Sequence, residues 1–217
     1  MSIDLGKDPT LLISLIFLET LFILIPAFIA SKVEKTLFVD EIREIGFQRQ
    51  ATTIKKMVVK VLVGLLIGVL FYFISGYIIS FFVNFVVRVL FGAQFVEEGI
   101  NNSISTTPVN PTPIQLVILV SLQILIIAPC EEGFFRGFTI GKSQKKIKKV
   151  YAVILSSILF TIYHIPPFLV PISTIITFFG YYFSFGILLS LTFILFKNSL
   201  LPSSIAHSTL NILILLF

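Results

Sequence analysis

Charged residues are scarce in this sequence. Asp, Glu, Lys and Arg make up only 12% of the 217 residues, whereas 56% are hydrophobic and the mean hydropathy is +1.03. Soluble globular domains carry about 25% charged residues, so this composition excludes a soluble domain. It indicates a polytopic membrane protein.

Cysteine, tryptophan and repeats are also scarce or missing. The single cysteine, Cys130, excludes an intramolecular disulfide, and its position in an apolar run is typical of a small packed hydrophobe. The sequence has no tryptophan, no internal repeat and no glycine-rich phosphate loop. We therefore expect one membrane domain, in which 1–113 carries helices and loops without a motif and 114–217 carries the candidate site.

Long apolar runs predict the membrane-spanning helices, because about 20 apolar residues suffice for one crossing. We predict an all-α, polytopic bundle of about six to eight transmembrane helices. The run at 57–91 is longer than one crossing needs, so it should tilt, protrude from the membrane or break near Ser75-Gly76. The six runs lie near 10–30, 57–91, 114–140, 150–165, 168–196 and 200–217.

The basic residues are concentrated in two loops. Seven of the 16 lysines and arginines lie at 32–60 and five more at 142–149, whereas 92–113 contains none. By the positive-inside rule, we predict that the loops 32–56 and 141–149 are cytoplasmic. Lysines beside membrane spans set topology and contact lipid headgroups, so we expect membrane lipids, and no nucleic acid, among the partners.

Two adjacent glutamates are the main candidates for chemistry. Apart from the basic loop and Lys197, the second half has three full charges, Glu131, Glu132 and Arg136. Ionisable groups at bilayer depth are costly and are functional candidates by default. Residues four apart share one helix face, while neighbours point about 100° apart. We therefore predict that Glu132 pairs with Arg136 and that Glu131 faces a site.

The same four-residue spacing recurs on the next helices, in Phe160 with His164 and in His207 with Asn211. At about 1.5 Å per residue from the basic ends, Glu131 lies ~16 Å deep, His164 ~20 Å and His207 ~10 Å. A carboxylate, two imidazoles and an amide at such depths are what water activation and oxyanion stabilisation require. We expect them to line a cavity that opens near the cytoplasmic face.

These three motifs resemble a known family. Glu-Glu-x-x-x-Arg, Phe-x-x-x-His and His-x-x-x-Asn, in that order on successive helices, are similar to the signature of the CPBP intramembrane proteases. That family includes the CAAX prenyl endopeptidases and the bacteriocin-processing Abi proteins. The resemblance covers roughly 114–217 and implies a helical catalytic core in that segment.

The resemblance also implies a role for each motif residue. Glu131 and His164 would activate the attacking water in a peptide hydrolysis. His207 and Asn211 would stabilise the tetrahedral oxyanion. The supporting residues would be Glu132, Arg136 and Phe160. The implied substrate is a peptide or lipidated peptide, for example a C-terminal tripeptide that follows a prenylated cysteine.

A metal is the main open question in this resemblance. The family is often called metalloprotease with zinc presumed, and Glu131, His164 and His207 would supply three ligands. The His-Glu-x-x-His helix of zincins is missing, and a zinc-bound Glu131 would not also be the free base. We therefore favour a metal-free glutamate and histidine mechanism, whose activity should resist chelators.

Two other functions compete with a protease. A transporter or channel would use the same acids and histidines as a proton or ion relay, although the chain has no duplicated half. A non-catalytic immunity or scaffold protein would keep the fold without turnover. Glu19, in the first apolar run, also lies at bilayer depth, and we expect it to pair or to line a water-filled cavity rather than to perform chemistry.

Overall fold

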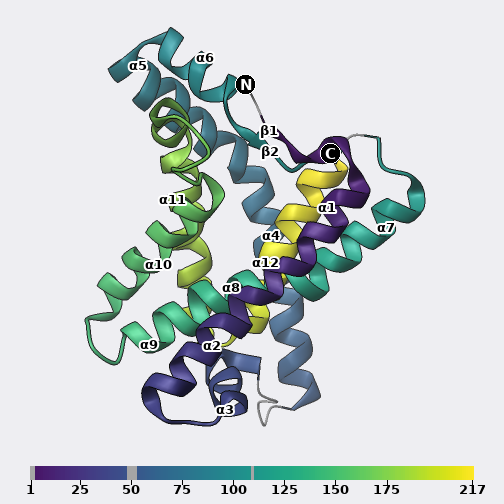
Figure 1. Cartoon of the computed structure of the whole chain (residues 1–217), viewed down its shortest axis with the longest axis vertical. Helices are drawn as coiled ribbons and strands as arrows, with labels where there is room; N and C mark the ends of the chain where they lie inside the picture. Colours follow the sequence, from purple (N-terminus) through teal and green to yellow (C-terminus); the bar gives the residue numbers. More distant parts are fainter. Residues whose placement is uncertain (1–2, 48–52, 109) are drawn as a thin grey trace.

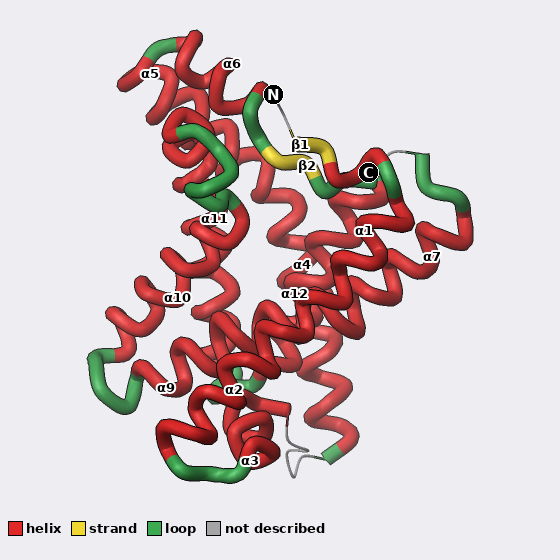
Figure 2. The backbone as a smooth tube through the Cα atoms, in the orientation of Figure 1, coloured by secondary structure: helices red, strands yellow, loops and turns green. Residues whose placement is uncertain are grey.

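The structure is a computed structural model that describes residues 3–47, 53–108 and 110–217. Almost all of this part of the chain is helical (Figure 2). Within it, the strands are limited to β1 (Ile3–Asp4) and β2 (Ile104–Ser105), which pair in parallel. The predicted all-α membrane bundle is confirmed.

Six helical rods form the bundle, and each corresponds to one predicted apolar run. Four of them are long and apolar enough to cross a membrane, and the other two are shorter apolar helices. The rods comprise α1 (Pro9–Ile16), η2 (Phe17–Thr20) and α2 (Leu21–Glu34); α4 (Ile54–Ser80), η4 (Phe81–Val87) and α5 (Arg88–Phe91); α7 (Pro113–Leu122), η5 (Gln123–Ile127), α8 (Ala128–Glu132), η6 (Gly133–Ile140) and α9 (Gly141–Ser143); α10 (Lys149–His164); α11 (Ile172–Leu195); and α12 (Leu200–Leu216).

The rod Ile54–Phe91 is 38 residues long and continues through Ser75-Gly76. The break considered at this point is therefore wrong. A Cβ atom at Gly76 would meet nothing within 4 Å, so this glycine serves no close contact and lies in a regular helix. At about 1.5 Å per residue the rod is roughly 57 Å long, and it must tilt or protrude from a bilayer core of about 30 Å.

Beyond this rod the chain turns back on itself. Gly92 adopts φ +89°, a left-handed conformation that suits glycine, and the following helix α6 (Ala93–Asn101) packs on α11. Thr174 Oγ1 donates a 2.8 Å hydrogen bond to the Gly99 carbonyl oxygen. The predicted outer segment 92–113 is thereby tied to the second half of the bundle.

Glycines on α4 let α12 approach closely. A Cβ atom at Gly64 would lie 2.9 Å from the Pro202 carbonyl oxygen, and one at Gly68 would lie 2.6 Å from that of Ala206. Small residues four apart permit such backbone contact between membrane helices. The spacing Gly64-x-x-x-Gly68 is therefore a packing face, and it fixes the helix that carries His207.

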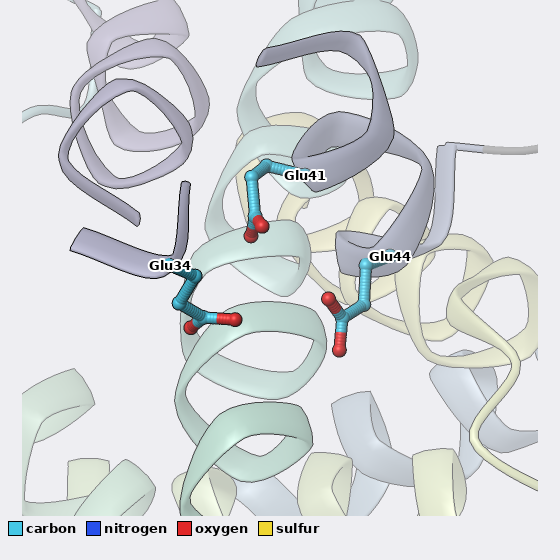
Figure 3. A group of neighbouring side chains, drawn as sticks. All are labelled: Glu34, Glu41 and Glu44. Carbon is cyan, nitrogen blue, oxygen red and sulfur yellow. The ribbon is translucent and has the colours of Figure 1, made fainter. Parts of the chain in front are cut away.

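The two basic loops meet at one end of the molecule, where α3 (Phe38–Ile42), η3 (Arg43–Phe47) and α9 lie (Figure 1). Residues 48–52 of the first loop lie outside the described residues. Three carboxylates from this loop converge there (Figure 3). Their oxygens are close enough together to bind a metal, but Lys142 Nζ lies 2.9 Å from Glu34, 2.8 Å from Glu41 and 2.9 Å from Glu44. An ammonium group thus balances the cluster and joins the loop to the rod Pro113–Ser143.

Replacing Lys142 should loosen this junction. Glu41 is buried, so Lys142→Met leaves its carboxylate without a cation and is expected to lower the Tm by roughly 5 °C, because the loss of a hydrogen-bonded charge costs about 1–2 kcal/mol. Thermal unfolding in detergent measures this. The exposed Lys146 offers a matched control, and an equal loss in Lys146→Met would show that only net charge matters.

The same junction predicts a pH dependence. Hydrogen bonds from Lys145 and then Lys142 lower the pKa of the Glu44 carboxyl below its ordinary value of 4.5. A lowered pKa adds stability above the unfolded value, and this stability is lost as the pH falls below 4.5 through the folded pKa. The Tm of the wild type should therefore drop on acidification below pH 4.5, and that of Lys142→Met should drop less. Parallel curves would contradict this assignment.

Candidate functional site

The helix that carries the two glutamates is irregular on both sides of them. It starts with a capping box in which Thr112 and Gln115 exchange side-chain to backbone hydrogen bonds. Pro129 has no N–H to donate to the carbonyl four residues earlier, and the preceding turn, η5, is π-helical. A second π-helical segment, η6, follows Glu132. The rotation of α8 about the helix axis is therefore shifted relative to the helical turns beyond η5 and η6.

Two glycines after the glutamates let α2 and η3 pack on this helix. A Cβ atom at Gly133 would lie 2.4 Å from Ile23 Cδ1, and one at Gly137 would lie 1.9 Å from the Ile45 carbonyl oxygen. The second contact is with the backbone of Ile45, so a side chain at Gly137 would require η3 to move. The site is thus buttressed by the N-terminal half of the chain.

Gly137→Ala should separate these two elements. We expect a loss of about 1–3 kcal/mol, the usual cost of overpacking, and a Tm lower by roughly 5 °C. Gly141→Ala is a matched control on the same rod, because its Cβ would meet nothing within 4 Å and alanine favours a helix. Thermal unfolding of both variants decides the point, and equal Tm values would show that η3 does not restrain the rod.

Glu132 is the centre of a buried ion network. Its Oε1 accepts a 2.8 Å hydrogen bond from Arg136 Nη1, and both side chains are fully buried. Arg136 Nη2 also donates to the Gly186 carbonyl oxygen at 3.2 Å, and the guanidinium lies 4.7 Å from the centre of the Phe160 ring. The predicted pairing of Glu132 with Arg136 forms as expected.

Glu132 has a further contact that its helix spacing did not reveal. His207 Nδ1 lies 3.0 Å from the same Glu132 oxygen. A carboxylate can only accept, so Nδ1 carries the hydrogen and the opposite nitrogen, Nε2, points away from Glu132. That Nε2 lies 3.9 Å from Glu131 Oε2. One imidazole therefore bridges the two glutamates, although they lie on different faces of their own helix.

Glu131 faces both histidines, as predicted. Its Oε2 lies 3.9 Å from His164 Nε2 as well as from His207 Nε2, and the residue is 3% exposed. His164 Nδ1 donates to the Phe160 carbonyl oxygen at 3.0 Å, since a carbonyl only accepts. In the neutral ring, His164 Nε2 is therefore an acceptor turned toward Glu131. The ring is held in place by Phe160 and Tyr182, whose centres lie 4.2 and 4.7 Å from its own.

A cavity of about 690 Å³ gives access to these groups. Glu131, His164, His207 and Asn211 all line it, so the structure brings together the four predicted catalytic residues. Apolar side chains of α1, α7 and α12 form much of the remaining wall. They include Leu12, Leu15, Ile16, Leu119, Leu210 and Ile214.

The direction of the cavity differs from the expectation. Its wall extends to Leu5, 103–108 and Leu169. The strand β1 directly precedes Leu5 and β2 lies within 103–108, and both strands are at the same end of the molecule as the two termini (Figure 1). The basic loops lie at the other end. The cavity therefore extends away from those loops, whereas the sequence predicted an opening near the cytoplasmic face. Counting residues from a helix end gives a depth, but it does not show at which end neighbouring helices diverge.

Of two further cavity residues, one has the role expected for it and the other had not been considered. Glu19 lines the cavity, and its Oε1 accepts a hydrogen bond from the Tyr163 hydroxyl. This agrees with the pairing and cavity role expected for it. Tyr163 itself had not been considered, although its position directly before His164 was a usable signal. Its ring packs on Phe22 and Phe135, with centres 4.8 and 5.9 Å apart.

A zinc ion fits the donor types of the site but not their spacing. Both imidazoles keep Nε2 free and have Nδ1 hydrogen-bonded, as metal-binding histidines do. Ligand atoms about 2.0–2.2 Å from tetrahedral zinc lie roughly 3.3 Å apart. The two Glu131 to histidine distances are 3.9 Å. Among the described residues, the only group of three acidic, histidine or cysteine ligands mutually within 4.8 Å is Glu34, Glu41 and Glu44. Glu131, His164 and His207 do not form such a group, although each histidine Nε2 lies within 4.8 Å of Glu131 Oε2. The two Nε2 atoms must therefore lie more than 4.8 Å apart, which is too far to share a tetrahedral zinc ion.

Fold and site together define a polytopic membrane protein with a buried carboxylate and imidazole centre. Residues 113–213, just under half of the chain, match the model of a protein family described as type II CAAX prenyl endopeptidase Rce1-like. This segment contains every predicted site residue, and the match confirms the family that the three motifs suggested. The motif-bearing part of the chain is thus similar to a family of CAAX proteases. No curated protein and no solved structure matches the chain.

Proposed function

We propose that this chain is an intramembrane endopeptidase that hydrolyses a peptide bond with a water molecule held between Glu131 and His164. The observation that carries the proposal is the pair of acceptors, Glu131 Oε2 and His164 Nε2, 3.9 Å apart at the wall of a cavity. A water oxygen at about 2.8 Å from each would direct its two hydrogens to these two atoms. Its lone pair is then free to attack a carbonyl carbon.

Glu131 is the base in this mechanism. It removes a proton from the water as the oxygen bonds to the carbonyl carbon, and it returns that proton to the amide nitrogen when the carbon–nitrogen bond breaks. The products are a carboxyl group and a free amine, so atoms and charge balance. His164 orients the water through Nε2, and its Nδ1 is fixed by the Phe160 carbonyl.

His207 and Asn211 stabilise the oxyanion. An imidazole whose Nδ1–H is bonded to a carboxylate donates from Nε2 only when it is protonated on both nitrogens. The Glu132 carboxylate, 3.0 Å away, supplies the negative partner for that imidazolium. Glu132 therefore positions His207, in addition to neutralising Arg136. Preorganised donors of this kind contribute about 10²–10³ in rate.

The proposed mechanism uses no metal. The spacing of Glu131, His164 and His207 supports this choice, as does the need for a free carboxylate as the base. Purified protein should therefore keep its peptidase activity after treatment with a chelator such as 1,10-phenanthroline. Activity that is lost to the chelator and restored by zinc would reverse the choice.

The substrates we propose are prenylated or otherwise membrane-anchored peptides. The apolar walls formed by α1, α7 and α12 suit a lipid chain beside the peptide. The test is cleavage of matched prenylated and unprenylated peptides by the purified protein, followed by mass spectrometry. A chain that cuts neither, and whose Glu131→Gln variant behaves identically, is not a protease of this kind.

We also propose that the basic loops are cytoplasmic and that substrate enters from the opposite side. In a Cys130→Ala background, Glu97→Cys on the exposed face of α6 should react with a membrane-impermeant maleimide on intact cells. Lys146→Cys should react only after permeabilisation. The reverse pattern would place the cavity opening in the cytoplasm.

A further inference from the structure

The carboxyl group of Glu19 is not used by the proposed mechanism, yet it lies in the same cavity. Glu19 belongs to η2, a short 3₁₀ segment in the middle of the rod Pro9–Glu34, and η2 packs against α8. One oxygen, Oε1, is bonded to the Tyr163 hydroxyl, while Oε2 is buried and has no hydrogen-bond partner among the described residues. Segment 1–112 lies outside the family match, so the family motifs assign nothing to this residue.

The position of this carboxyl is fixed through Tyr163. Tyr163 holds it through the hydrogen bond, and Phe22, one turn along the same rod, packs edge-on against the Tyr163 ring. The ring of Tyr163 in turn lies 5.0 Å from that of His164. Glu19 is therefore held next to the groups that orient the attacking water.

The cavity wall combines acidic groups with two histidines, and the histidines lie against Glu131, Glu132 and the Phe160 carbonyl. Two carboxyl groups, Glu19 and Glu131, line it, and none of the described lining residues is a lysine or arginine. Arg136 is fully buried beside Glu132 and does not line the cavity. A buried carboxylate is stabilised by an opposite charge and by hydrogen bonds to its remaining oxygen. A cationic group of a ligand would give the free Glu19 oxygen the partner that the described lining residues do not supply.

We propose that Glu19 binds a positively charged group of the substrate, a lysine or arginine side chain or a free amino terminus close to the scissile bond. This rests on the proposed peptidase function and adds a specificity-determining residue to it. A hydrogen-bonded charge pair in a dry site favours the cationic peptide by at least about tenfold over a neutral one. An acidic residue at the same position is disfavoured by repulsion from both carboxylates.

The test uses a set of peptides with one common sequence. In each peptide a single position, among the three before and the three after the cleaved bond, carries Lys, norleucine or Glu. The ratio of kcat/KM for the Lys and norleucine peptides is measured with the full-length protein in detergent. Wild type should favour Lys by about tenfold or more at one position, mainly through KM, and Glu19→Gln should bring the ratio close to one. Glutamine keeps an acceptor for Tyr163, so the fold is maintained.

Two further variants separate charge from structure. Tyr163→Phe removes the hydrogen bond but keeps the carboxylate, and it should retain the preference for Lys. Glu97→Gln makes the same charge change at an exposed site outside the cavity and should leave the ratio unaltered. A ratio that is the same in wild type and Glu19→Gln, while cleavage proceeds, overturns this inference and leaves the peptidase function standing.

A binding measurement tests the role of Glu19 if no peptide is cleaved. If wild type cuts none of the peptides, the proposed function fails, and the Kd values of fluorescent Lys and norleucine peptides then decide the role of Glu19. Tighter binding of the Lys peptide that disappears in Glu19→Gln supports a cation site. Equal Kd values in both proteins overturn it.

Discussion

Glu131→Gln is expected to reduce peptide hydrolysis by about a thousandfold without unfolding the protein. A general base contributes roughly 10²–10⁴ in rate, and glutamine keeps the shape and one oxygen of the side chain but cannot take a proton. Glu131 Oε2 has no hydrogen-bond partner among the described residues, so glutamine, which has the same shape, removes no hydrogen bond at this atom. The loss should therefore appear in kcat, with KM and Tm close to wild type.

The matched comparison is with His164. His164→Gln removes the second acceptor for the water but leaves the base, so a smaller loss, of about 10–100-fold, is expected. Single-turnover cleavage of one peptide by both variants gives the two values. A Glu131→Gln protein that still cuts at more than a tenth of the wild-type rate would remove the base from the mechanism.

The contacts of the site that could be predicted are those set by the spacing of residues along one helix. The four-residue interval between Glu132 and Arg136 places both side chains on one helix face, and the structure pairs them at 2.8 Å. The same reasoning left Glu131 free to face the histidines, which it does at 3.9 Å. Such intervals are local, and helix geometry alone determines their outcome.

The contact between Glu132 and His207 was not predictable in this way. The two residues are 75 positions apart, and a histidine ring has two nitrogens that reach in opposite directions. Whether it bridges both glutamates depends on the rotation of α12 against α8. That rotation is set by contacts such as Gly68 with Ala206, for which the sequence provides only a common pattern of small residues.

In the fold, too, features set by one segment were predictable, and contacts between distant segments were not. The apolar runs predicted every rod, because hydrophobic length depends on the residues of that segment alone. They did not predict the return of α6 onto α11 or the pairing of β1 with β2, which join distant parts of the chain. The end toward which the cavity extends depends on those distant contacts, so it could not be predicted from the apolar runs.

Removing Glu132 should be more damaging to the fold than removing Glu131. Arg136 is fully buried, and Glu132→Leu would leave its guanidinium without a counter-charge. Breaking a buried ion pair from one side costs about 3–5 kcal/mol, which corresponds to a Tm lower by roughly 10 °C or more in a chain of this size. Thermal unfolding in detergent measures this loss, and a near wild-type Tm would show that Arg136 is balanced elsewhere.

The double variant Glu132→Leu, Arg136→Met separates stability from chemistry. Replacing both members of a buried pair by apolar residues is often neutral or stabilising, so the Tm should return to near the wild-type value. The Gly186 carbonyl loses Arg136 but still accepts from Ser190 Oγ at 2.7 Å. Peptide hydrolysis should nevertheless stay about 100-fold or more below wild type, because His207 has lost the carboxylate that holds its Nδ1–H. If the double variant recovers both activity and stability, the role of Glu132 is to neutralise Arg136 alone. If it recovers stability without activity, Glu132 also holds His207 and thereby supports stabilisation of the oxyanion.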